Sequence, residues 1–375
     1  MGYLELGGAG GGLFIEEASM DALAKVDTIV FDCDGVLLDV RESYNACVGA
    51  TVSRLVEALT GTHISPDLFD GRLNHLYKST GGFNSDWSYC YALVMAILSK
   101  APQWALRELD RYAAESLGLP GPCERLRHLT HRVEASIPLA GLYAWLASFS
   151  SRLDASGVEG VDRLTKRRVG EHLAEALNPL NGVGVSVVST LFEELFLGCQ
   201  LFREVHGREA CFTDQPQGYV RRGRRAITEE TLDGLEGLLG GPRFGVASGS
   251  MEATASLLLG PLKSRIPLEA QFWFETVERW ERRLGLEGLQ KPNGFSLRAA
   301  ASTHKPAAPL YVGDTVADLL TARDAGEDFL FAGVYGLAHL PHEARGFFMG
   351  EGCPVVARSV NQLPHALRYA RFASE

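Results

Sequence analysis

From residue 242 to the C-terminus, short apolar runs alternate with segments of helical periodicity. The expected strands are 244–247, a strand or loop near 270–274, 310–312, 329–334 and 355–357. The expected helices between and after them are 251–259, 293–302, 316–325 and 360–369. Strands that alternate with helices form parallel βαβ units, so this region predicts a doubly wound, Rossmann-like α/β sheet.

The first strand of this sheet is expected much earlier, at Thr28–Phe31, where a β-branched and aromatic run suits a fully buried strand. It ends in Asp32-Cys33-Asp34-Gly35. Residues i and i+2 of an extended chain point the same way, so Asp32 and Asp34 reach one edge of the sheet, where ligands of such sheets bind. Two close carboxylates repel, and a divalent cation, a shared proton or separated pKa values relieve this. The alternative is an ordinary Asp-Gly turn.

Between these two regions lies a long stretch with a mainly helical pattern and little strand signal. The expected helices within it are 41–59, 87–98, 104–117, 139–153, 158–177, 187–203 and 228–239. The sequence therefore predicts a catalytic core formed by residues 1–40 and 241–375, with residues 41–240 as a large, mainly helical inserted cap domain.

Composition narrows the classes of partner. A net charge of −10 argues against general nucleic-acid binding. The sequence has no run of 18 or more apolar residues, so no membrane span is expected. The seven cysteines are scattered without a CxxC pair, and no signal peptide is apparent, which predicts a reducing cytoplasm without a disulfide framework or zinc site. The sequence is compatible with a homo-oligomer. A glycine-rich run at 7–12 reads as a turn or short hairpin more than as a phosphate loop.

Two further segments carry candidate anion-binding groups. Ser248 and Gly249 follow the strand at 244–247, where a hydroxyl and backbone N–H groups can bind an anionic oxygen, although a serine there can equally cap the next helix. Lys291 precedes a helix and offers a compact positive charge for a phosphate. Lys305 stands in the same Lys-Pro context, but it lies too close to the strand at 310–312 for a helix to intervene, so Lys291 is preferred.

A third expected strand, 310–312, ends in Gly313-Asp314, with Asp318 four residues further on. Asp314 sits at the strand tip, and oxygen ligands at strand tips suit Mg²⁺. Asp318 falls in the first turn of the next helix, where it either caps the helix or reaches the site.

Four arginines in the segment 219–225 form a basic cluster, which is either a solvated loop or a contact for a phosphorylated or carboxylated substrate. The candidates are Arg203, Arg221, Arg222, Arg224 and Arg225.

Taken together and in order, these segments resemble the four motifs of the haloacid dehalogenase-like (HAD) hydrolase superfamily. Asp32 and Asp34 look like its first motif, Ser248 its second, Lys291 its third, and Gly313-Asp314 with Asp318 its fourth. The resemblance covers residues 27–40 and 228–370, and the block between them lies where many members insert a helical cap.

The resemblance implies a Mg²⁺-dependent phosphatase acting on a small phosphorylated metabolite. Asp32 would form an aspartyl-phosphate and Asp34 would act as acid and base. Ser248, Gly249 and Lys291 would hold the phosphoryl oxygens, and Asp32, Asp34 and Asp314 would hold Mg²⁺, with Asp318 supporting them. Dehalogenases of the superfamily do not carry the second acid, so Asp34 favours phosphoryl transfer. A phosphomutase of the same superfamily and a non-catalytic binding protein on this fold are the alternatives.

Overall fold

The computed structural model describes residues 2–7, 11–83 and 85–374 of the 375-residue chain. By internal contacts the chain divides into two units, one of Met1–Val40 with Gly223–Glu375 and one of Arg41–Arg222. The return to the first unit therefore lies at 222/223 and not at the expected 240/241. The reason is that the helix at 229–239 packs its Leu232 and Leu235 into the core of the first unit.

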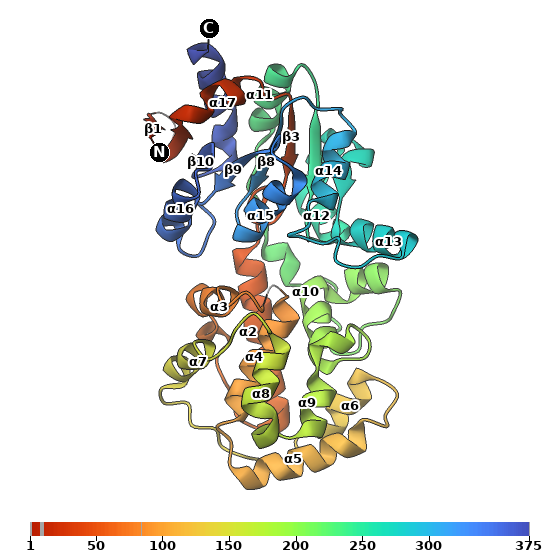
Figure 1. The fold of residues 1–375 in the computed structure, drawn as a ribbon. Helices are drawn as coiled ribbons and strands as arrows, with labels where there is room; N and C mark the ends of the chain where they lie inside the picture. Colours follow the sequence, from red (N-terminus) through yellow and green to blue (C-terminus); the bar gives the residue numbers. More distant parts are fainter. Residues whose placement is uncertain (1, 8–10, 84, 375) are drawn as a thin grey trace. The chain divides into compact units, whose positions relative to one another are not determined.

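The first unit is built on an eight-stranded sheet in the order β1-β2-β10-β9-β8-β3-β6-β7. Figure 1 labels β1, β10, β9, β8 and β3 of this sheet. Its strands are β1 (Tyr3–Leu6), β2 (Leu13–Glu16), β3 (Thr28–Phe31), β6 (Phe244–Ala247), β7 (Gln271–Phe272), β8 (Pro309–Gly313), β9 (Leu330–Val334) and β10 (Val355–Ala357). The six strands from β10 to β7 run parallel, while β1 and β2 add an antiparallel pair at one edge. The expected doubly wound α/β core is confirmed.

Helices cover both faces of this sheet. They are α1 (Met20–Ala24), α11 (Glu229–Leu239), α12 (Glu252–Leu259), α13 (Phe274–Leu284), α14 (Phe295–Ser302), α15 (Val316–Ala325), α16 (Pro341–Gly350) and α17 (Leu363–Ala373). Ile29 and Phe31 of β3 pack with α1, α11, α12 and α17 on one face. Val30 faces the other side and packs with α14, α15 and α16. The alternation of strand side chains thus builds two apolar layers around one sheet.

Short elements complete this unit. A two-stranded sheet pairs β4 (Leu38–Asp39) with β5 (Arg224–Arg225), where the chain leaves the unit and returns to it. The glycine-rich run at 7–12 lies between β1 and β2, and its residues 8–10 fall outside the described part of the chain. Short 3₁₀ helices of the chain are η1 (Glu17–Ser19), η2 (Pro66–Leu68), η3 (Pro179–Asn181), η4 (Tyr219–Arg222), η5 (Gly260–Arg265), η6 (Leu268–Ala270) and η7 (Val360–Gln362).

The second unit is helical. Its helices are α2 (Arg41–Thr60), α3 (Gly71–Lys78), α4 (Asp86–Leu98), α5 (Gln103–Ser116), α6 (Pro122–Leu129), α7 (Leu142–Ser150), α8 (Val158–Val169), α9 (Glu171–Leu177) and α10 (Val187–His206). The helix α4 is buried along most of its length and contacts α2, α7, α8 and α10. The single helix expected over 158–177 is divided at Gly170, whose φ of 127° no helix accommodates. The helix α10 carries a kink at Gly198.

One cysteine pair corrects the sequence-based expectation that the chain has no disulfide. Cys123 of α6 and Cys211 form a disulfide across 88 residues of sequence, with their Cα atoms 6.2 Å apart. The helical fold of the second unit brings the two positions together, and their spacing in the sequence carries no sign of it. Among the described residues, no helix is long and apolar enough to cross a membrane.

Candidate active site

Three neighbouring strands bring the candidate residues to one edge of the sheet. β3 lies between β8 and β6, with Phe31 aligned to Val312 on one side and to Val246 on the other. All three strands are parallel, so their carboxyl ends meet at the same edge. Asp32, Asp314 and Ser248 directly follow these strand ends, as the sequence predicts.

The turn after β3 is tightly bonded to the backbone around it. The Asp32 N–H donates to the carbonyl of Val312 at 2.8 Å, and the Cys33 carbonyl accepts from Leu37 N–H at 2.8 Å. Gly35 has a φ of 81°, and a Cβ at this position would overlap Oδ2 of Asp314. Glycine is therefore what lets the turn approach Asp314 closely.

Lys291 joins two carboxylates of the site. Its Nζ donates to Oδ1 of Asp32 at 2.7 Å and to Oδ1 of Asp318 at 2.6 Å. Burial lowers the pKa of Lys291, but the charges of Asp318 and Asp32 outweigh it and hold that pKa above its usual range. The ammonium group is therefore fixed as a cation between the two acids, and the structure places Lys291 beside Asp32 as the sequence analysis preferred.

Asp318 is the most heavily bonded acid of the group. Its Oδ2 accepts from Thr315 Oγ1 at 2.6 Å and from Asp314 N–H at 3.2 Å. It closes a capping box with Thr315 at the start of α15, so it both caps the helix and reaches Lys291. Burial raises the pKa of Asp318, but the charge of Lys291 and the hydrogen bonds from Lys291, Thr315 and Tyr311 lower it by more, so the net shift is downward.

Asp32 and Asp314 behave in the opposite way. Burial is the main cause that raises the pKa of Asp32 to about 6, with the charge of Asp318 adding to it and Lys291 opposing it. Burial and the charge of Asp318 also raise the pKa of Asp314. In both acids burial outweighs the opposing charge of Lys291, so ionising them together is unfavourable without a further positive charge.

This carboxylate group fits a divalent cation. One oxygen from each of Asp32, Asp314 and Asp318 lies within 4.8 Å of the others. Oδ1 of Asp314 is buried and has no hydrogen-bond partner within the described chain. A buried carboxylate oxygen without a donor is costly, and a hard cation that takes oxygen ligands, such as Mg²⁺, would satisfy it.

The remaining candidates lie at the strand ends beside this cluster. Ser248 is buried, its Oγ donates to Ser250 Oγ at 3.0 Å, and it accepts from Ser250 N–H at 3.2 Å. A Cβ on Gly249 would meet nothing within 4 Å, so this stretch of backbone faces open space. Asp34 is half-buried, and its charge raises the pKa of Asp32.

Tyr311 is a member of the site that the sequence analysis missed. Its hydroxyl lies 2.8 Å from Asp318 Oδ1 and 3.2 Å from the carbonyl oxygen of Ala247, so its single proton is directed at these two acceptors. Its ring lies 5.4 Å from Lys291 Nζ. The signal was present, because a tyrosine in an otherwise apolar, buried strand needs a partner for its hydroxyl.

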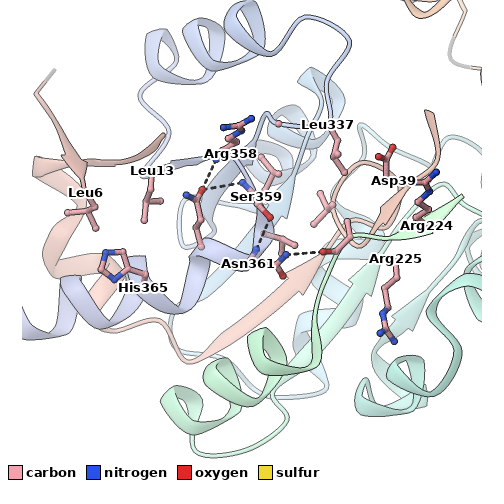
Figure 2. A pocket seen from close by; sticks show the side chains of 16 residues that line it. Leu6, Leu13, Asp39, Arg224, Arg225, Leu337, Arg358, Ser359, Asn361 and His365 are labelled. Carbon is pink, nitrogen blue, oxygen red and sulfur yellow. Dashed lines mark hydrogen bonds between the residues drawn. The ribbon is translucent and has the colours of Figure 1, made fainter. Parts of the chain in front are cut away.

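A pocket of about 830 Å³ opens elsewhere in the first unit (Figure 2). Asp39, Arg224 and Arg225 of the β4–β5 pair line it together with the segments that follow β9 and β10. Because β9 and β10 are parallel to β3, the pocket lies at the same edge of the sheet as Asp32. The basic cluster of 219–225 is thus divided: Arg224 and Arg225 line this pocket, whereas Arg221 and Arg222 belong to the second unit.

The walls of this pocket are held by hydrogen bonds. Asn361 Nδ2 donates to the carbonyl of Ala226 at 2.9 Å, and Gln362 Oε1 accepts from Arg358 N–H at 2.9 Å. None of the acids of the carboxylate cluster, nor Lys291, lines it. It is therefore distinct from the carboxylate cluster.

Comparison with known proteins supports the fold and leaves the family open. No protein-family model matches the chain, and no curated protein matches it. The X-ray structure of Northeast Structural Genomics Consortium target ZR25 matches with a TM-score of 0.66 and 18% identity, covering 92% of this chain and 98% of its own. Phosphatase Tt82 from Thermococcus thioreducens matches with a TM-score of 0.48 and 18% identity, covering 82% of this chain and 92% of its own. The chain therefore shares its overall fold with the structural-genomics target.

Proposed function

We propose that this protein is a Mg²⁺-dependent phosphatase of the HAD-like superfamily that hydrolyses a small phosphomonoester in the cytoplasm. The observation that carries the proposal is the buried group of Asp32, Lys291 and Asp318, with an unsatisfied oxygen of Asp314 beside it. The four sequence motifs, in the superfamily's order, support the same assignment. The helical second unit would serve as the cap that selects the substrate.

In this proposal Asp32 attacks phosphorus and forms an aspartyl-phosphate, which divides one difficult displacement into two easier ones. Asp34 protonates the leaving oxygen, and then takes a proton from the water that hydrolyses the intermediate. Both acids come from the same turn after β3, so one short segment supplies nucleophile and general acid.

The remaining groups hold charge in place. Lys291 and Ser248, with the backbone N–H of Gly249, would bind the non-bridging phosphoryl oxygens. Asp318 and Tyr311 would keep Lys291 oriented. Asp32, Asp314 and the backbone carbonyl of Asp34 would hold Mg²⁺, which when bound neutralises negative charge on the transferring group.

Hydrolysis of p-nitrophenyl phosphate with and without added Mg²⁺ tests the proposal. We expect Mg²⁺-dependent release of phosphate, and a fall of about a thousandfold or more in kcat for Asp32→Asn, which removes the nucleophile. Asp328→Asn is the matched control, because Asp328 is an exposed acid of the same unit outside the site. Full activity in Asp32→Asn would contradict the assignment of the nucleophile.

A panel of phosphorylated metabolites separates the alternatives. Net release of inorganic phosphate supports a phosphatase, whereas conversion of a sugar phosphate to its isomer, without net release, would show a phosphomutase. Absence of turnover across the whole panel would favour a binding protein on this fold.

A further inference from the structure

A second cluster of metal-ligating side chains lies in the helical unit, far along the sequence from the catalytic motifs. It consists of Cys123 in α6, Glu194 in α10, and Cys211 in the segment that follows α10. The two sulfur atoms and one carboxylate oxygen of Glu194 all lie within 4.8 Å of one another. Cys123 and Glu194 are buried, whereas Cys211 is exposed.

Glu194 fixes the segment around Cys211 to α10. Its Oε2 accepts three backbone hydrogen bonds, from Cys211 at 2.8 Å, Phe212 at 2.5 Å and Thr213 at 3.2 Å. Hydrogen bonds to a charged acceptor are among the stronger ones in proteins. These bonds do not involve the disulfide, so breaking the disulfide leaves Cys211 held close to Cys123.

The other oxygen of Glu194 has no such partner. The residue is 0% exposed, and its Oε1 makes no hydrogen bond within the described chain. The positive charge of Arg54, an exposed side chain, acts on the Glu194 carboxylate. One oxygen of Glu194 lies near both sulfur atoms, and a buried carboxylate with an oxygen that no donor satisfies is suited to accept a cation.

We propose that this cluster is a redox-gated metal site, in which reduced Cys123 and Cys211, with Glu194, bind a thiophilic divalent cation such as Zn²⁺. Two thiolates and a carboxylate give three of the four ligands of a tetrahedral zinc site, and water takes the fourth position. The oxidised cluster is closed to metal because its sulfur atoms are bonded to each other.

Reduction of the Cys123–Cys211 disulfide opens the site to metal. A trialkylphosphine donates two electrons to the S–S bond, which breaks to give two thiols, and the phosphine takes oxygen from water to become its oxide. Binding of the cation then releases the two thiol protons. Exposure of Cys211 gives the reductant and the cation access to the cluster.

Cobalt(II) is the probe that tests this site, because thiolate ligands give it a strong charge-transfer absorption that oxygen ligands do not. The full-length protein is reduced with the phosphine, the phosphine is removed under anaerobic conditions, and the protein is titrated with Co²⁺. We expect one equivalent to bind with thiolate charge transfer, and the oxidised protein to show none. Cobalt at the carboxylate cluster of the first unit adds no such band. Zn²⁺ should displace the Co²⁺ and abolish the band, since it binds such sites more tightly.

Variants assign the ligands. Cys123→Ser and Cys211→Ser should each lose the charge-transfer band. Cys199→Ser should keep it, because Cys199 is a free, half-buried thiol that contacts the Asp214 carbonyl in the same segment. Glu194→Gln keeps an acceptor for the three backbone N–H groups but is a weaker ligand, and we expect Co²⁺ to bind about tenfold or more weakly.

The comparison of reduced and oxidised wild-type protein needs no substitution, so a misfolded variant cannot obscure the result. The proposal is overturned if reduced wild-type protein shows no thiolate band, if Cys123→Ser retains it, or if Glu194→Gln binds Co²⁺ as tightly as wild type.

Discussion

Replacement of Lys291 by methionine removes the only cation that the described structure places between Asp32 and Asp318. The two contacts are 2.7 and 2.6 Å long. The side chains are 15% exposed for Lys291, 9% for Asp32 and 2% for Asp318. Methionine keeps much of the aliphatic length but cannot donate a hydrogen bond, so the variant isolates the loss of charge.

The burial decides the size of the effect. Surface ion pairs contribute about 0–1 kcal/mol, whereas removing one partner of a buried pair costs about 3–5 kcal/mol because it leaves charge uncompensated. We therefore expect the free energy of opening of the first unit to fall by about 3–5 kcal/mol at pH 7 without metal. That corresponds to roughly a hundredfold or greater increase in the equilibrium population of the open form.

Native-state hydrogen exchange, followed by mass spectrometry of peptides, measures the free energy of opening of the first unit separately from that of the second. The informative amides are those of β3 and β8, which flank the site. Lys305→Met is the matched control, since Lys305 is an exposed lysine in the same Lys-Pro context and should change protection by less than about 0.5 kcal/mol.

The stability that the first unit loses in the Lys291→Met variant, here called the deficit, should also depend on pH. Lys291 lowers the pKa of Asp32 and of Asp314, so both values rise further in the variant. The folded variant then holds more protons than the unfolded chain near neutral pH, and its stability increases as pH falls. We expect the deficit to shrink from pH 8 to pH 5. A loss of stability under 1 kcal/mol, or one that is constant from pH 8 to pH 5, would show that Lys291 is not the buried counter-charge of these acids.

Three other outcomes follow from the structure. Tyr311→Phe removes one donor to Asp318 but keeps the ring, and should reduce protection of β8 in the same exchange experiment by roughly 1–2 kcal/mol. Gly35→Ala places a methyl group against Asp314 and should weaken Mg²⁺ binding, measured by calorimetry, by about tenfold or more, while Gly237→Ala, with nothing within 4 Å of its Cβ, should leave it unchanged. Burial raises the pKa of most free thiols, to about 12 for one of them, so iodoacetamide at pH 7.5 should label only Cys199 rapidly in the folded, oxidised protein. The thiols expected to resist it are Cys33, Cys47, Cys90 and Cys353.

Local sequence patterns were sufficient for the parallel part of the sheet and for much of the site, but not for the antiparallel edge strands β1 and β2. The strand expected at Thr28–Phe31 is observed with those bounds, and so is the strand at Phe244–Ala247. Both are short apolar runs that end in polar residues and glycine, so the pattern marks the strand and its carboxyl end together. Parallel pairing then brings Asp32 and Asp314 to one edge without further information.

Features that depend on long-range packing could not be read from the sequence. The pairing of Cys123 with Cys211 depends on how the helices of the second unit pack. The helix α11 carries no local sign of the unit to which it belongs, and only its packing against α17 assigns it. Asp318 was expected either to cap α15 or to reach the site, and the structure shows both, because its two oxygens serve different donors.

In the proposed mechanism Asp32 is the nucleophile and carries the phosphoryl group between the two half-reactions. Enzyme mixed with p-nitrophenyl phosphate and Mg²⁺, quenched in acid within the first turnover and digested, tests it directly by mass spectrometry. We expect the peptide that contains Asp32 to gain the mass of one phosphoryl group, to lose it on treatment with hydroxylamine, and to show no gain in Asp32→Asn. Turnover of substrate with no phosphoryl group on Asp32, or with the label on another residue, would contradict the account.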